Sequence, residues 1–129
     1  MQTITIGASA KREIVVTNKM SAIEVGSGDV LVFATPIMIA YMEATSVDAI
    51  KDQLDSSETS VGTLVNIRHL AATGLGKTVR IRAEVTAVEG RQVSLTVQAW
   101  VGEQLIGDGT HTRVVVDKER FMQRVEAQN

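Results

Sequence analysis

A helix that is apolar on almost every side constrains this chain more than any other feature. It begins at Thr35 and Pro36, where proline suits the first helical position because its missing N–H would be unpaired anyway. We expect the helix to run to about Leu54, with Thr35 as its cap. Its first half carries one charge, that of Glu43. A helix that is hydrophobic all round is surrounded by protein, so other segments must cover it.

The strands that follow the helix can supply this cover. Alternating apolar and polar residues predict strands at 59–71, 78–87, 92–101 and 104–116. We also expect short β-type runs at 3–6 and 13–17, a loop at 24–29, an extended run at 30–33 and a terminal helix at 118–126. Gly107 and Gly109 inside the last strand indicate a bulge or the close approach of another backbone. A helix followed by antiparallel strands gives the α+β class, in a single domain over residues 1–129.

Composition narrows the functional classes. The chain has 129 residues, no cysteine and a formal net charge of −2. These values exclude a disulfide framework and a thiolate metal site, and they give no basic surface for nucleic acid. Neither a signal peptide nor an apolar stretch long enough to cross a bilayer is visible. We therefore expect a cytoplasmic protein with no nucleic-acid or membrane partner.

The single carboxylate in the first half of the helix points to a site. Burying an unpaired carboxylate costs several kcal/mol, so Glu43 needs a partner, and His69 and Arg113 on the strands are the candidates. Thr35 precedes Glu43 by two helical turns, about 12 Å, so the two side chains cannot touch within one helix. A site that uses both must be elongated or shared between two chains. The shared arrangement favours a symmetric dimer.

Structural interpretations compete with these roles. Thr35 could be a helix cap and nothing more, Glu43 a structural carboxylate, and His69 a core histidine whose hydrogen bonds are satisfied. The odd-numbered positions from Val61 to His69 are expected to share the strand face that packs on the helix. His111 is interpreted as a strand residue without chemistry. Gly74–Thr78 lacks the leading glycine of a phosphate loop, and no metal-ligand spacing is present.

Several motifs of the sequence occur together in one family. They are the helix start at 32–43, the strand segments 59–62 and 69–73, and the tail 107–116. Together they resemble the fluoroacetyl-CoA thioesterase family of hotdog-fold proteins, over roughly residues 12–121. The resemblance implies a curved antiparallel sheet wrapped around a long central helix, and a homodimer with its sites at the interface. It also implies an acyl-CoA substrate, with no metal and no cofactor beyond the coenzyme A of that substrate.

The resemblance assigns roles to five residues. Thr35, Glu43 and His69 match the catalytic set, and Gly62 and Arg113 match residues that line the substrate site. In the family the carboxylate attacks the thioester carbonyl or activates water toward it. Histidine assists proton transfer and threonine hydrogen-bonds in the site.

Substrate selectivity is the point on which the sequence departs from the family. The fluoroacetyl-specific member covers its site with aromatic side chains, and the matching stretch 22–30 contains none. We therefore expect a thioesterase for short acyl groups in general. The sequence leaves open whether the thioester is carried by CoA or by a carrier protein, and whether the protein assembles beyond a dimer. The alternatives are a non-catalytic hotdog protein that binds acyl-CoA or another small ligand, and a hotdog dehydratase or hydratase.

Overall fold

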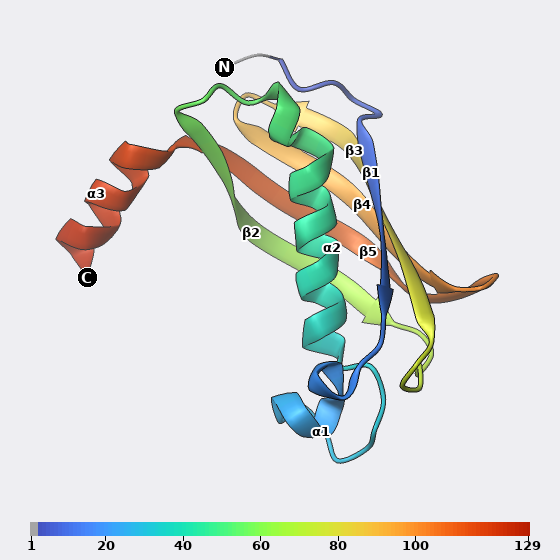
Figure 1. Cartoon of the computed structure of the whole chain (residues 1–129). Coiled ribbons are helices and arrows are strands. Elements are labelled where there is room, and N and C mark those ends of the chain that lie inside the picture. The colour runs from blue at the N-terminus through green and yellow to red at the C-terminus, as the bar shows by residue number, and fades with distance from the viewer. Residues whose placement is uncertain (1–2) are drawn as a thin grey trace.

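A computed structural model describes residues 3–129 as one long helix laid across a curved antiparallel sheet (Figure 1). The strands are β1 (Ser9–Val15), β2 (Glu58–His69), β3 (Thr78–Glu89), β4 (Gln92–Val101) and β5 (Gln104–Asp117). The helices are α1 (Ala22–Val25), α2 (Thr35–Ile50) and α3 (Lys118–Gln128), with 3-10 turns at Asn18–Met20 and Lys51–Gln53. The strand order β1-β3-β4-β5-β2 places β1 and β2 at the edges. The expected α+β class with a sheet curved around a helix is confirmed.

The hydrophobic core lies between α2 and the inner face of the sheet. The inward side chains of the central strands are all at most 1% exposed: Val79, Ile81, Ala83, Val85, Val93, Leu95, Val97 and Ala99. Met38 and Met42 of α2 pack against them. Gly90 and Gly102 adopt positive φ angles of 60° and 57° at the reversals between β3, β4 and β5. The alternation of the sequence therefore translates directly into the two faces of β3 and β4.

The start of α2 differs from the prediction. Thr35 is the first residue of the helix, Ala34 occupies the N-cap position, and no side chain caps this end. The threonine hydroxyl is instead engaged by a residue of β2, described below. The helix ends at Ile50 and continues as the 3-10 turn, which accounts for the predicted end near Leu54.

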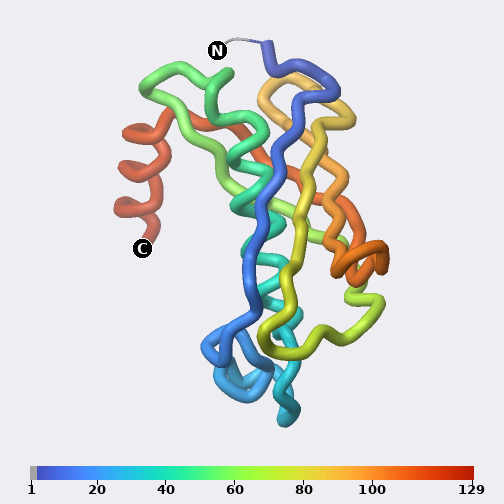
Figure 2. The backbone as a smooth tube through the Cα atoms, turned by 45° about the vertical axis from the view of Figure 1, so that its right-hand side comes forward, coloured from blue at the N-terminus to red at the C-terminus, as the bar shows by residue number. Residues whose placement is uncertain are grey.

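Only one side of α2 is covered by its own chain. The buried residues of the helix form a stripe that faces the sheet, whereas Pro36 and Ala40 are exposed and Ile39 is half-buried. Figure 2 shows the same arrangement from a second direction, with β1 passing in front of α2 and α3 standing apart from the sheet. The expectation that protein surrounds this helix is wrong for a single chain.

The edge strand β2 contains an irregularity that the alternation did not reveal. Its ladder with β5 shifts register between Gly62 and Leu64, so Thr63 is an extra residue, a β-bulge. Ser60 and Gly62 face the helix before the bulge, and Val65 and His69 face it afterwards. The odd-numbered face was therefore predicted correctly for His69 and wrongly for Val61.

The segment before α2 contains less β-structure than expected. Residues 3–6 form no strand, and β1 ends at Val15. Part of the predicted loop 24–29 belongs to α1, which begins after Ser21 and ends at Gly26 with φ 77°. Within 30–33, Val32 and Phe33 make single β-bridges only.

The close approach of another backbone that the two glycines of β5 predicted occurs at Gly109, whereas Gly107 meets methionine side chains of α2. A Cβ on Gly107 would lie 2.6 Å from Met38 Sδ, and a Cβ on Gly109 would collide with the backbone carbonyl of Asn66 on β2. These two positions let the helix and the edge strand approach β5 closely. Within residues 3–129, none of the helices has the length and apolarity that crossing a membrane requires.

Candidate active site

Thr35 and His69 meet at the N-terminal end of α2. Thr35 Oγ1 lies 2.7 Å from His69 Nδ1, because the last residue of β2 passes beside the first residue of the helix. The Phe33 ring meets the imidazole edge-on, with centroids 6.5 Å apart and planes at 84°. Burial lowers the pKa of His69, so the imidazole is neutral at pH 7. Nε2 is buried and has no hydrogen-bond partner among the described residues, and Nδ1 is the ring nitrogen that meets Thr35.

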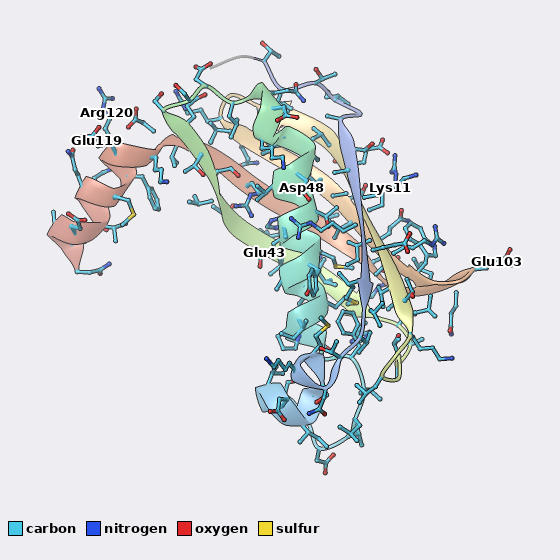
Figure 3. All side chains as sticks on the ribbon, viewed as in Figure 1. Lys11, Glu43, Asp48, Glu103, Glu119 and Arg120 are labelled. Atoms are coloured by element: carbon cyan, nitrogen blue, oxygen red, sulfur yellow. The ribbon has the colours of Figure 1, made fainter. Side chains whose placement is uncertain are left out.

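Glu43 belongs to a second group of residues, on the side of α2 that faces β2 (Figure 3). Its Oε2 lies 3.8 Å from Nη1 of Arg113 on β5. This geometry selects Arg113 over His69 as the carboxylate's partner. The Glu43 side chain is 42% exposed, so the predicted burial of this carboxylate is wrong within a single chain. Its exposed side is open to a second molecule.

Arg113 is held firmly beneath this carboxylate. The arginine side chain is 8% exposed, and it donates from Nε to Ser60 Oγ at 2.8 Å and from Nη2 to the Ser60 carbonyl at 2.9 Å. Burial lowers the pKa of Arg113, and the nearby Glu43 carboxylate opposes that shift. Gly62 lies directly against the group, since a Cβ there would sit 3.0 Å from Glu43 Oε2. The five predicted site residues thus fall into two groups, one at Thr35 and one at Glu43.

The two groups are separated along the helix. Glu43 follows Thr35 by about two turns, roughly 12 Å along the axis, and their side chains contact different strand segments. The prediction that these two residues do not meet within one chain is consistent with this geometry.

His111 and Ser60 are the site-lining residues that sequence reasoning missed. His111 is 1% exposed and its ring lies 3.1 Å from Arg113 Nη1, so it belongs to the Glu43 group. The available signal was strand parity, because His111 and Arg113 are two residues apart and share a face of β5. Ser60 was hidden by the bulge, which changes the parity of β2.

A hollow of about 370 Å³ opens beside the Thr35–His69 pair. Its wall includes Ala22, Gly28 and Val30 from the segment before α2, and Phe33 is the aromatic residue in its lining. Val30 is 55% exposed. The wall is therefore small and aliphatic on the side where the sequence lacks aromatic residues.

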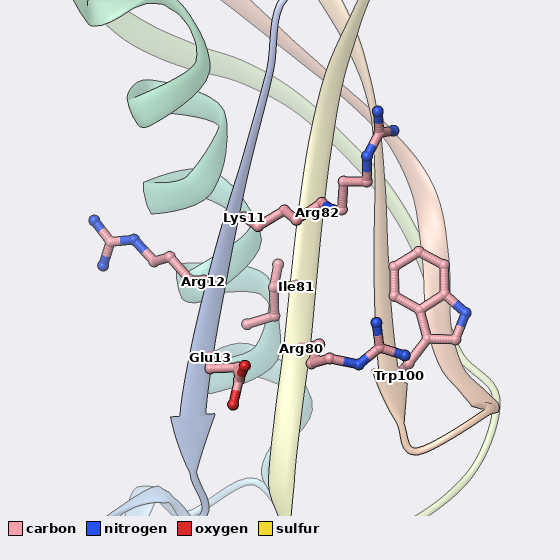
Figure 4. A pocket seen from close by; sticks show the side chains of 7 residues that line it. All are labelled: Lys11, Arg12, Glu13, Arg80, Ile81, Arg82 and Trp100. Carbon is pink, nitrogen blue, oxygen red and sulfur yellow. The ribbon is translucent and has the colours of Figure 1, made fainter.

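A second hollow, of about 270 Å³, lies on the outer face of β1, β3 and β4 (Figure 4). Its arginines are already engaged, Arg12 with Asp48 at 2.7 Å. The Arg80 guanidinium lies 5.6 Å from the Trp100 ring centroid and donates to the Gly102 carbonyl, and Arg82 pairs with Glu84 at 2.6 Å. This surface has the character of a solvated strand face. No group of three or more His, Asp or Glu side chains within residues 3–129 is arranged to hold a metal ion.

Comparisons with known proteins point to thioesterases. The family model described as fluoroacetyl-CoA-specific thioesterase matches residues 16–119. The fluoroacetyl-CoA thioesterase of Streptantibioticus cattleyicolor is 44% identical over 94 residues, 73% of this chain and 68% of that protein. A solved structure of the fluoroacetyl-CoA thioesterase FlK matches with a TM-score of 0.92 at 33% identity, over 99% of both chains. The crystal structure of a Thermus thermophilus thioesterase superfamily member matches with a TM-score of 0.89 at 32% identity, over 99% of this chain and 97% of that one.

These matches cover both the sheet and the helix that carry the candidate residues, and they confirm the hotdog fold. The family match includes the segments that contain Thr35, Glu43, Gly62, His69 and Arg113. The chain belongs to the fluoroacetyl-CoA-specific thioesterase family.

Proposed function

We propose that this chain hydrolyses short acyl-CoA thioesters in a site shared by two copies of the chain. Membership of the family makes it a thioester hydrolase that acts on acyl-CoA. The observation that carries the shared site is the separation of the Thr35–His69 pair from the Glu43–Arg113 pair on one α2 helix. A second chain is the simplest way to bring one pair beside the other.

The uncovered surfaces of the monomer support a dimer at the β2 edge. Leu64 and Val65 at the middle of β2 are 51% and 47% exposed, and the adjoining side of α2 presents Pro36 and Ala40. An exposed edge strand is a template for pairing with another strand. Pairing of two β2 strands would cover these apolar residues and continue the sheet across both copies.

The spacing along β2 supports a two-fold axis in this position. Glu43 lies against Gly62 near the start of β2, and Thr35 lies against His69 at its end. An antiparallel pair of β2 strands centred between Val65 and Asn66 would set Gly62 opposite the partner's His69. Such a two-fold interface is self-complementary and creates two equivalent sites. Each site would then hold Glu43 of one chain beside the partner's Thr35 and the partner's His69.

The chemistry assigned to this site follows from the side chains. Glu43 attacks the thioester carbonyl or activates the water that does so. If Glu43 activates water, the proton taken from that water passes by way of His69 Nδ1 to the departing thiolate as the carbon–sulfur bond breaks, and the free acid is left. If Glu43 attacks directly, the thiolate leaves an acyl-glutamyl anhydride; a water molecule then hydrolyses the anhydride, which restores the carboxylate and supplies the proton of the thiol. Ile37 and Met38 N–H both donate to the Ala34 carbonyl, and Pro36 has no N–H. The Thr35 hydroxyl and N–H are therefore the groups of the first helical turn available to the carbonyl oxygen.

The hollow beside Thr35 supports short acyl groups as substrates. The small aliphatic side chains of its wall can contact a short acyl chain without an aromatic cover. Acetyl, propionyl and butyryl thioesters of CoA are therefore proposed as substrates, without selectivity for a fluorinated group.

A thiol-release assay on a panel of acyl-CoA esters tests the activity. The protein has no cysteine, so a thiol reagent reports coenzyme A alone. Glu43→Gln should reduce kcat by about 10²- to 10⁴-fold, the usual contribution of a general base. Asp48→Asn is the matched control, because Asp48 is a carboxylate on the same helix that pairs with Arg12 at 2.7 Å. Wild-type kcat in Glu43→Gln would contradict the proposal. Tight acyl-CoA binding without thiol release would indicate a binding protein. Hydration of an enoyl-CoA would indicate a hydratase.

Mixing two inactive variants tests whether the site is shared. His69→Ala and Glu43→Gln each inactivate both sites of a homodimer. In a mixed dimer of shared sites, one site carries both defects and the other is intact. After exchange of subunits at equal concentrations, activity should therefore recover to about a quarter of the wild-type value. A mixture that stays inactive although mixed dimers are detected would show that each site lies within one chain.

A further inference from the structure

His111 is a buried, polar residue to which the proposed reaction assigns no role. It lies on β5 with 1% of its surface exposed, two residues from Arg113. Both ring nitrogens have partners: Nδ1 lies 2.7 Å from the Leu64 carbonyl, and Nε2 lies 3.1 Å from Arg113 Nη1. A buried imidazole that is satisfied on both sides is an ordered part of the structure.

The identity of these partners fixes the proton on the ring. A backbone carbonyl can only accept a hydrogen bond, so Nδ1 carries the proton and donates it to Leu64. A guanidinium can only donate, so Nε2 is bare and accepts from Arg113. His111 is therefore neutral and held in one tautomer. Burial lowers its pKa, the Arg113 charge lowers it as well, and the Leu64 carbonyl and the Glu43 carboxylate act in the opposite direction.

The backbone of β2 supplies one of these partners through its bulge. Leu64 is the residue that follows the extra Thr63, and its carbonyl accepts from a side chain of β5. Bulges often redirect groups next to active sites. Here the bulge supplies the carbonyl that holds Nδ1 of the His111 ring.

Nε2 of the His111 ring limits the orientation of the Arg113 guanidinium. Nε and Nη2 of the guanidinium are bound to Ser60, which leaves Nη1 between His111 Nε2 and Glu43 Oε2. A Cβ on Gly62 would lie 3.1 Å from His111 Cε1 and 3.3 Å from Arg113 Nη1, so the glycine gives the two side chains room to meet. Among the described residues, Arg113 and Glu43 are the charged groups whose influence reaches His111.

We propose that His111 is a positioning residue for Glu43. By accepting a hydrogen bond from Arg113 Nη1, it holds the guanidinium in the orientation that faces the carboxylate. The imidazole does not touch the substrate and acts through Arg113. This inference rests on the proposed function, in which Glu43 carries out the attack on the thioester.

Two substitutions separate positioning from general support of the fold. His111→Gln places an amide oxygen near the position of Nε2 and keeps an acceptor for Arg113, but loses the donor to Leu64. His111→Asn keeps a donor near Nδ1 for the Leu64 carbonyl and is too short to reach Arg113. Each variant loses one buried hydrogen bond, so both should lower Tm by similar amounts. Only His111→Asn releases the guanidinium.

The expected result is a split between the two variants in kcat. His111→Asn should lower kcat roughly 10- to 100-fold with KM within about twofold of wild type, because misplacing a reacting group by about 1 Å costs up to 10²-fold. His111→Gln should keep kcat within about threefold of wild type. Equal losses in both variants, or wild-type kcat in His111→Asn, would overturn the proposal. If Glu43→Gln is inactive in the same assay while His111→Asn is fully active, this inference fails and the proposed function stands.

A measurement on the unaltered protein tests the premise without relying on either variant. Long-range ¹H–¹⁵N NMR spectra of the histidine rings at about pH 7.5 should show His111 with a protonated Nδ1 and a bare Nε2. A protonated Nε2, or rapid exchange between tautomers, would leave no acceptor for Arg113 and would refute the assignment.

Discussion

Gly62→Ala tests how tightly the Glu43 group is packed. Gly62 has no positive φ angle, so alanine fits its backbone and the effect is steric alone. The new Cβ would lie 3.0 Å from Glu43 Oε2, 3.1 Å from His111 Cε1 and 3.3 Å from Arg113 Nη1. The last two atoms belong to buried side chains, so the partly exposed carboxylate moves most. To reach an ordinary contact of 3.4 Å, its oxygen must withdraw by about 0.4 Å.

This displacement sets the size of the expected effect. If about 1 Å of misplacement costs about 10²-fold in rate, a shift of about 0.4 Å lowers kcat roughly five- to tenfold. The remaining crowding should reduce the free energy of unfolding by about 1 kcal/mol. The assay is thiol release from acetyl-CoA, with KM and the thermal midpoint measured in parallel. Gly74→Ala is the matched control, because a Cβ there meets nothing within 4 Å and its φ is not positive. Wild-type kcat in Gly62→Ala would refute the inferred packing around the carboxylate.

Two further predictions concern stability. Gly109→Ala should destabilise the protein by about 3 kcal/mol or more, because its Cβ collides with the backbone of Asn66. Gly107→Ala should cost less, since a flexible methionine end can move aside; equal denaturant midpoints for the two variants would contradict this ranking. Burial lowers the pKa of both His69 and His111, so the unfolded chain takes up protons first as the pH falls below 6.5. The contribution of the two histidines to the free energy of unfolding is complete above pH 6.5 and is lost as the pH falls. Urea denaturation at about pH 7.5 and about pH 5.5 measures this loss, and the variant lacking both imidazoles is the control.

The fold was largely predictable because its strongest signals are local. The two-residue alternation in β3 and β4 and the proline near the start of α2 each report a short stretch of chain. The errors arose where a distant contact overrides a local preference. Thr35 is a good capping residue, yet its hydroxyl meets His69, 34 residues away. Residues 3–6 have β-forming side chains but no strand partner in the structure.

The candidate site was predictable in its residue types more than in its grouping. A carboxylate in an apolar helix indicated Glu43, with His69 and Arg113 as candidate partners, and the family resemblance added Gly62 and assigned a role to Thr35. Which of these residues meet depends on the register between strands, and no single-strand pattern encodes that register. The burial expected for the helix also fails within one chain, because Pro36 and Ala40 are exposed and Ile39 is only half-buried in the monomer.

The bulge at Thr63 makes the site depend on the length of β2 as well as on its side chains. Upstream of Thr63 the even-numbered residues face the helix, and downstream the odd-numbered ones do, so the strand consists of two halves in opposite phase. Gly62 and His69 are an odd number of positions apart and would face opposite sides of a regular strand. The extra residue Thr63 is what lets both of them face the helix. A substitution scan of β2 would leave this dependence unseen, because it changes side chains and not the number of residues between Gly62 and His69.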